Sequence, residues 1–149
     1  MDTFWEEVEM RTARFTAAGV GLSLAVLATV SGAIAQEGLS RYQGAWLAGG
    51  ADCAEVYSSA GKGTSFKKPV DIFAPAFIIS SNRLRTPQAS CRIKSVRPAG
   101  DRQSLVLDCT NAVAGDQVRV LIAPQSDGSL KRYFNAEDTT GTTYKHCSR

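Results

Sequence analysis

Four cysteines constrain the fold of this chain more than any other feature. Cys53, Cys91, Cys109 and Cys147 are separated by 38, 18 and 38 residues. Structural zinc sites use cysteine ligands in closely spaced pairs, and this chain has no such pair. An even number of cysteines in an exported protein is typical of a disulfide framework. We therefore predict two disulfides, on the condition that the chain leaves the cytoplasm.

The first 35 residues have the pattern of a secretory signal. Residues 19–28 are apolar and uncharged, Arg11 and Arg14 precede them, and residues 33–35 form the small-x-small triplet of a cleavage site. An uncleaved membrane anchor is the alternative, because the apolar run approaches the roughly 20 residues that span a bilayer. The first nine residues carry four acidic side chains, which suits a signal poorly, so Met10 is the better start. We predict cleavage after Ala35 and a periplasmic or secreted protein without a transmembrane segment.

Residues 36–149 are then one domain on grounds of length. This part of the chain has fifteen basic and ten acidic residues, a net charge of +5. A domain of this size buries a modest core, so disulfides would contribute much of its stability.

From Phe77 onward the chain is predicted to form short strands separated by turn residues. The pattern favours an all-β fold, a small antiparallel meander that forms a barrel or a sandwich. Asp52 and Glu55 form a capping-box pattern, which predicts one short helix from Cys53 to about Ser59. Prolines at both ends of residues 70–74 favour an edge strand or a crossing loop there. The predicted strands are residues 77–79, 90–96, 105–109, 118–123, 130–134 and 142–147.

One predicted hairpin specifies a disulfide pairing. With Gly100 at its centre, Cys91 lies opposite Cys109, a separation that a disulfide can span. The second bridge is then Cys53–Cys147 by elimination, and the rival is sequential pairing of neighbouring cysteines. The same register places two further pairs on the apolar face of the cysteines, Ile93 with Leu107 and Ser95 with Leu105. The more polar face has Arg92 opposite Asp108 and Lys94 opposite Val106.

The sequence gives little support for catalysis, and we expect no enzyme, no cofactor and no metal. The chain has one histidine, His146, and no Gly-x-Ser-x-Gly motif. Residues 61–65 lack the glycine spacing of a phosphate-binding loop. Paired carboxylates can hydrolyse glycosides, and Asp71 with Glu137 or Asp138 have no evident structural role. An envelope hydrolase is therefore the least favoured hypothesis.

Basic residues cluster in the middle of the chain at strand-like spacing. Such a patch attracts polyanions, although a solvated sheet face has the same composition. Export and the lack of interleaved aromatic residues argue against nucleic acid. We predict a non-enzymatic protein that binds an anionic envelope glycan or lipid through Arg83, Arg85, Arg92 and Lys94. The wider group adds Arg97, Arg102, Arg119, Lys131 and Arg132.

The Gly44-Ala45-Trp46 sequence resembles the G-x-W start of lipocalin-like barrels, which include small secreted protease inhibitors. The pattern of this motif, Cys53, residues 66–77 and 91–96 and the C-terminal cysteine is similar to that of uncharacterised exported proteins of rhizobium-type alphaproteobacteria. The first resemblance implies the alternative function, inhibition of an extracellular hydrolase such as a lysozyme or a protease. The second implies compartment and class and no activity.

Overall fold

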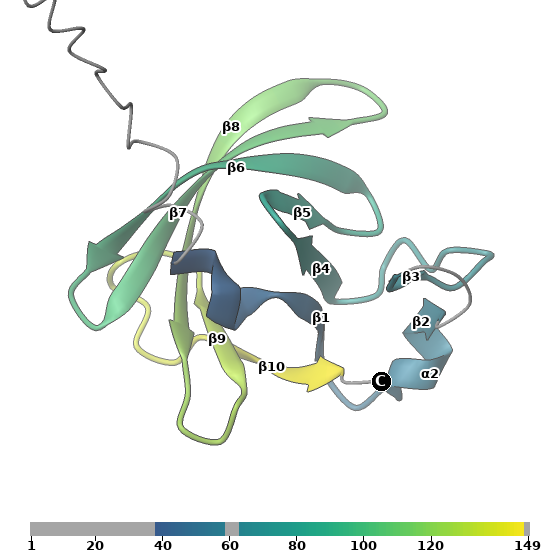
Figure 1. The fold of residues 1–149 in the computed structure, drawn as a ribbon, viewed down its shortest axis with the longest axis horizontal. Coiled ribbons are helices and arrows are strands. Elements are labelled where there is room, and N and C mark those ends of the chain that lie inside the picture. Colours follow the sequence, from purple (N-terminus) through teal and green to yellow (C-terminus); the bar gives the residue numbers. More distant parts are fainter. Residues whose placement is uncertain (1–37, 59–62, 148–149) are drawn as a thin grey trace, which may run out of the picture.

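The computed structural model describes residues 38–58 and 63–147, and the predicted signal peptide and its cleavage site lie outside them. Within the described residues, eight antiparallel strands form a closed barrel (Figure 1). Each strand pairs with the next along the barrel, and the last returns to the first, so the predicted all-β meander is confirmed as a barrel. The strands are β1 (Gly44–Ala48), β4 (Ala76–Ser80), β5 (Arg83–Arg85), β6 (Ala89–Ala99), β7 (Arg102–Asn111), β8 (Gly115–Pro124), β9 (Leu130–Tyr133) and β10 (Thr142–Cys147).

Apolar residues that alternate along the strands fill the barrel toward the end at which β1 begins. Leu47 and Leu105 are fully buried on opposite sides of the wall, Leu47 facing outward and Leu105 inward. The inner core includes residues of β1, β4, β7 and β10 together with Leu39, which precedes the 3₁₀ turn η2 (Ser40–Tyr42), and Tyr42, which ends it. Because η2 directly precedes β1, its side chains close the end of the barrel at which β1 begins.

Trp46 anchors this closed end. It is buried, stacks on Phe77 of the neighbouring strand, and donates its indole N–H to the carbonyl oxygen of Tyr42 at 2.9 Å. Gly44 has a φ of +114°, and a Cβ there would overlap the imidazole of His146. The Gly44-x-Trp46 sequence therefore has a structural role, in which the glycine admits the histidine ring and the tryptophan fastens the end of the barrel.

A small flap covers the outer face of β1 and β4. It consists of α2 (Cys53–Val56), β2 (Tyr57–Ser58) and β3 (Ser65–Phe66), which Figure 1 shows beside the barrel. The predicted capping box at Asp52 and Glu55 is confirmed, but the helix ends at Val56 rather than near Ser59 because Tyr57 is already extended. The Tyr57 hydroxyl donates to the carbonyl oxygen of Trp46 at 2.6 Å. This contact joins the flap to the barrel wall.

Both predicted disulfides are confirmed. Cys53 pairs with Cys147, which ties the flap to the last strand, and Cys91 pairs with Cys109 across β6 and β7. The respective Cα–Cα separations are 5.8 and 3.9 Å. The rival sequential pairing is wrong.

The register of the β6–β7 hairpin is confirmed near the disulfide and wrong near the turn. Ile93 lies opposite Leu107 as predicted, but Ser95 lies opposite Val106 and Val96 opposite Leu105. The turn contains two residues, Gly100 and Asp101, and the ladder shifts between Ile93 and Ser95, where Lys94 is the extra residue. The shift turns Val96 rather than Ser95 toward the core, which is the favourable choice because valine can be buried without a hydrogen-bond partner.

Two barrel strands were not predicted from the sequence. In β1 all residues after the first are buried, so the alternation that marks a half-buried strand is missing. In β5 only three residues are extended. Residues 70–74 contain no strand, which decides the open alternative in favour of a loop.

Candidate functional site

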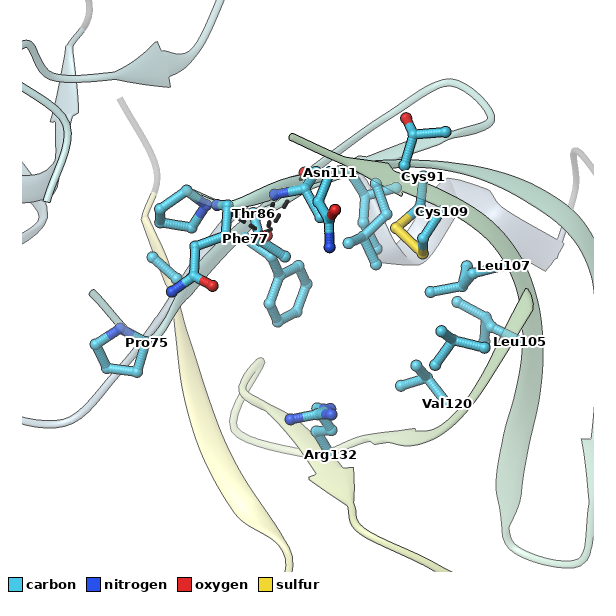
Figure 2. Close-up of a pocket in the computed structure, with 18 of the residues that line it drawn as sticks. Pro75, Phe77, Thr86, Cys91, Leu105, Leu107, Cys109, Asn111, Val120 and Arg132 are labelled. Atoms are coloured by element: carbon cyan, nitrogen blue, oxygen red, sulfur yellow. Dashed lines mark hydrogen bonds between the residues drawn. A yellow bond between two sulfur atoms is a disulfide. The ribbon is translucent and has the colours of Figure 1, made fainter. Parts of the chain in front are cut away.

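One end of the barrel is open, and a cavity of about 580 Å³ extends inward from it (Figure 2). This volume lies within the roughly 300–1,000 Å³ of ligand pockets. The opening is bordered by residues 72–75, the β5–β6 loop and the β7–β8 turn. The inner wall is mainly apolar and contains the Cys91–Cys109 disulfide together with Phe77, Ile79, Leu84, Leu105, Leu107, Val118, Val120, Ile122 and Tyr144.

One arginine lies among these apolar residues. Arg132 reaches from β9 into the cavity and faces the disulfide and Leu105 across it (Figure 2). Its orientation follows from alternation along β9, because Leu130 is a fully buried core residue and Arg132 lies two positions further on. Arg132 is exposed within the open cavity, and its side chain has no hydrogen-bond or ion-pair partner among the described residues. Among the described residues, Asp116 at the rim is the one other charged residue that lines the cavity.

The polar groups of the rim are used to hold its loops. The Asn111 side chain accepts hydrogen bonds from the backbone of Val113 and Ala114, each at 2.8 Å. The Gln88 amide donates to the carbonyl oxygen of Ile72 at 2.7 Å, which joins two segments of the rim. Since these groups are already paired, Arg132 is the group best placed to bind a charged ligand.

The four predicted ligand-binding residues lie on the outside of the barrel. Arg83 and Arg92 are exposed and directly opposite each other on β5 and β6, and Lys94 is exposed at the bulge. Arg85 is half-buried and donates to the carbonyl oxygen of Thr64 at 3.0 Å. We call Arg83, Arg92, Lys94, Arg97 and Arg119, all exposed, the outer basic face.

Asp108 lies beside this face without neutralising it. It is opposite Arg92 in the ladder, as predicted, but the pair forms no ion pair. Within the described residues the ion pair that forms is Arg102 with Asp101, at 3.8 Å and with Asp101 89% exposed. A pair so exposed contributes little to stability.

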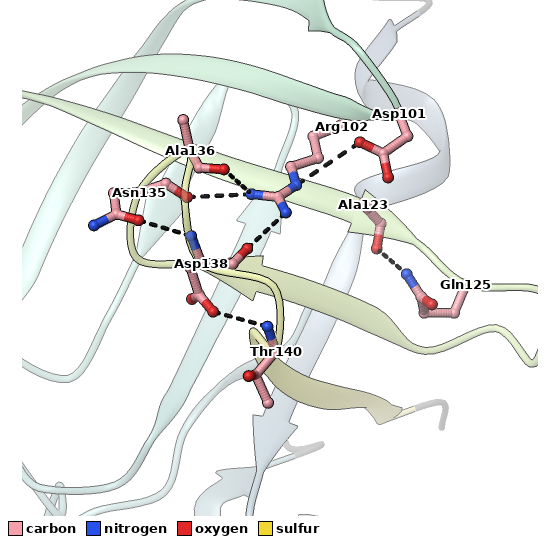
Figure 3. Close-up of polar contacts among 8 residues, drawn as sticks. All are labelled: Asp101, Arg102, Ala123, Gln125, Asn135, Ala136, Asp138 and Thr140. Atoms are coloured by element: carbon pink, nitrogen blue, oxygen red, sulfur yellow. Dashed lines mark hydrogen bonds and ion pairs between the residues drawn. The ribbon is translucent and has the colours of Figure 1, made fainter.

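Arg102 has a structural role instead of a place on the basic face. Its guanidinium lies 3.6 Å above the Tyr133 ring and donates to three carbonyl oxygens of the β9–β10 loop, on Asn135, Ala136 and Asp138 (Figure 3). The fork of donors on arginine suits such multiple contacts. Spacing along the sequence alone did not separate Arg102 from the exposed arginines.

Two of the three carboxylates of the hydrolase hypothesis, Asp71 and Asp138, have structural roles, and Glu137 is exposed. Asp138 accepts backbone N–H groups of Phe134, Thr140 and Gly141, and the hydrogen bonds from Phe134 and Gly141 are the main reason that its pKa is lowered. Asp71 accepts the backbone N–H of Phe73 at 2.9 Å. Asp71 and Asp138 thus each bind the backbone of their own loops, and the hydrolase hypothesis stays a prediction.

His146 lies at the closed end of the barrel, away from the cavity. Its ring packs edge-on against Trp46, and its Nε2 is 3.2 Å from the carbonyl oxygen of Gln43. Residues 38–58 and 63–147 contain no group of three or more His, Cys, Asp or Glu side chains placed to hold a metal ion. No helix in this part of the chain has the length and apolar character needed to cross a bilayer.

No protein-family model, curated protein or solved structure matches this chain. The resemblances at Gly44-x-Trp46 and along the exported part of the chain therefore stay predictions.

Proposed function

We propose that this is a non-enzymatic binding protein of the periplasm or the exterior that holds a small amphiphile in the open end of its barrel. The observation that carries the proposal is the apolar cavity with Arg132 inside it. Apolar walls that enclose a ligand contribute affinity in proportion to the area removed from water. A single polar group within such walls fixes the orientation of the ligand.

Arg132 defines the class of the ligand. A guanidinium pairs with a carboxylate or phosphate through two parallel hydrogen bonds. The Arg132 side chain is exposed to solvent inside the open cavity, so a ligand can reach it. Tyr144 on β10, two residues beyond Thr142, the ladder partner of Arg132, also lines the cavity. We infer a ligand with an apolar chain or ring system and one anionic group, such as a fatty acid or a related carboxylate.

Competition for a fluorescent fatty acid tests this proposal. Cis-parinaric acid would accept energy from Trp46, and oleate and oleyl alcohol would compete with it. We expect Arg132→Gln to weaken oleate binding about tenfold, the loss of one charge-assisted contact, and to leave oleyl alcohol unchanged. Arg119→Gln, on the outer basic face, is the control and should change neither.

A second pair of variants locates the ligand. Val120 lines the cavity and Val106 lies on the outer face of the neighbouring strand. Val120→Trp should fill the cavity and abolish probe binding, while Val106→Trp should leave it intact. Probe binding by Val120→Trp at wild-type affinity, in a folded protein, would place the ligand elsewhere and refute the proposal.

The outer basic face favours a second function, binding of an anionic envelope polymer. The specific observation is that Arg83 and Arg92 lie side by side, since directly opposed like charges destabilise a sheet unless an anion lies between them. Retention on heparin or lipopolysaccharide beads should fall with salt and be lost in Arg92→Ala with Lys94→Ala. Unchanged retention of this variant would exclude the face as a binding site. Inhibition of an extracellular hydrolase is the alternative that the Gly44-x-Trp46 resemblance and the disulfide-linked β scaffold suggest.

A further inference from the structure

Apolar side chains protrude at two points beside the mouth of the cavity. Phe73 is 83% exposed and Val113 92% exposed, and Ile72 and Val118 are 50% and 40% exposed. Phe73, Ile72 and Val118 line the cavity, and Val113 lies on the β7–β8 turn that borders it. Exposed apolar residues gathered at one place mark a surface that contacts another molecule or a membrane.

The backbone beneath these side chains is held in place. Asp71 accepts the backbone N–H of Phe73, and Asn111 accepts those of Val113 and Ala114. The carbonyl oxygen of Ile72 accepts the Gln88 amide. Two protruding apolar tips are thus held beside one opening. The Phe73 side chain can enter an apolar environment without a change in the conformation of its loop.

The charge near these tips favours an anionic surface. Lys67 and Lys68 are exposed on the segment that leads to Phe73, the Lys67 ammonium donating to the carbonyl oxygen of Ala54 at 3.3 Å, and the half-buried Arg85 lies near the rim. Asp71 and Asp116 are the acidic residues there, and the described residues together carry thirteen basic and nine acidic side chains. Apolar residues flanked by lysine and arginine are typical of segments that lie in the membrane interface.

A second copy of this chain is a poorer occupant. A two-fold contact through the same surface would bring the Lys67 and Lys68 pairs of both copies together, and like charges repel. The two tips also stand around an opening rather than on a flat face, so mutual contact would leave the cavity between them unfilled. The lipids of a bilayer are mobile and can surround both apolar tips and the opening between them.

We propose that the mouth of the barrel docks on the surface of an anionic membrane, with Phe73 and Val113 inserted among the lipids, so that an amphiphile can pass between bilayer and cavity. The transfer of the amphiphile rests on the function proposed above, whereas docking does not. In this orientation Phe73, Ile72 and Val118, which line the cavity near its mouth, face the bilayer and give a lipid chain apolar contacts on its way.

Flotation with lipid vesicles tests the docking. The wild-type protein should float with vesicles of phosphatidylethanolamine and phosphatidylglycerol and remain unbound with phosphatidylcholine alone. Phe73→Ser with Val113→Ser should lower the affinity for the anionic vesicles about tenfold, the loss expected from one partly buried aromatic ring and a valine. Phe134→Ser is a matched control, because Phe134 is 88% exposed but lies outside the cavity lining.

Tryptophan substitutions give a second readout. In Phe73→Trp the added fluorescence should shift to the blue on addition of anionic vesicles and be quenched by brominated lipid, while Phe134→Trp should show neither change. Equal vesicle binding by the wild type and the double serine variant would overturn the proposal. A dimer in light scattering that the double variant abolishes would overturn it in favour of self-association.

The two proposals fail in different ways. Binding of cis-parinaric acid without vesicles tests the cavity alone, and the double serine variant should keep it. If the wild-type protein binds cis-parinaric acid but does not bind anionic vesicles, docking is refuted. Vesicle binding without probe binding refutes the cavity as the destination of the ligand and leaves the docking surface.

Discussion

The imidazole of His146 occupies the space that a side chain on Gly44 would need. Gly44 begins β1 and His146 lies near the end of β10, so this contact is made where the barrel closes on itself. The His146 ring in turn packs against Trp46. The closure of the barrel thus depends on a glycine at one position of the first strand.

Substitution of Gly44 should therefore destabilise the barrel. We expect Gly44→Ala to lower the free energy of unfolding by about 2 to 4 kcal/mol, because a positive φ and a steric overlap act together. Urea denaturation measures the loss. Gly49→Ala is the matched control, since Gly49 has a φ of +79° but no atom within 4 Å of its added Cβ. If His146→Ala restores none of the stability of Gly44→Ala, the overlap is not the cause.

Removal of either disulfide should destabilise the protein, and the longer loop should matter more. Cys53–Cys147 closes a separation of 94 residues and Cys91–Cys109 one of 18. Chain-entropy arguments give losses of about 4 to 5 and about 3 kcal/mol for the paired alanine variants. Thermal and urea unfolding of both variants provide the comparison. A larger loss for the Cys91 and Cys109 variant would show that packing against the cavity wall outweighs loop closure.

Stability should fall at alkaline pH through Tyr57. Burial raises the pKa of Tyr57 from 10.0 to about 12, so between these values the unfolded chain loses its proton while the folded protein keeps it. The stabilisation is present below pH 10 and is lost as the pH rises toward 12. Tyr57→Phe should flatten the pH dependence of unfolding in this window. The same slope in wild type and variant would assign it to other groups.

Arg102 should hold the β9–β10 loop in a way that lysine cannot reproduce. We expect Arg102→Lys to cost about 2 kcal/mol, because an ammonium cannot reach three carbonyl oxygens and stack on Tyr133 together. Hydrogen exchange should become faster in residues 134–141 and remain unchanged in β6. Arg97→Lys, at an exposed position of the same sheet, is the control. Unchanged exchange in the loop would show that Asp138 alone holds it.

The sequence by itself determined the all-β class and the pairing of Cys91 with Cys109. Both follow from local rules, because turn residues separate the strands and a hairpin fixes which residues oppose each other near its middle. The same rules failed near Gly100, where a two-residue turn and a bulge offset each other. Val96 faces the core because burial of an apolar side chain is worth more than an unbroken ladder.

Only the tertiary structure decided the candidate site. Alternation in β9 places Arg132 on the same face as Leu130. That face is the inner one because β10 pairs with β1 and closes the barrel, which buries Leu130. Arg102, Arg85 and Arg132 look alike in sequence, and contacts with distant loops and strands give them different roles. The cavity and the apolar tips beside it likewise depend on how far the core fills the barrel, which is a property of the packed molecule rather than of any segment.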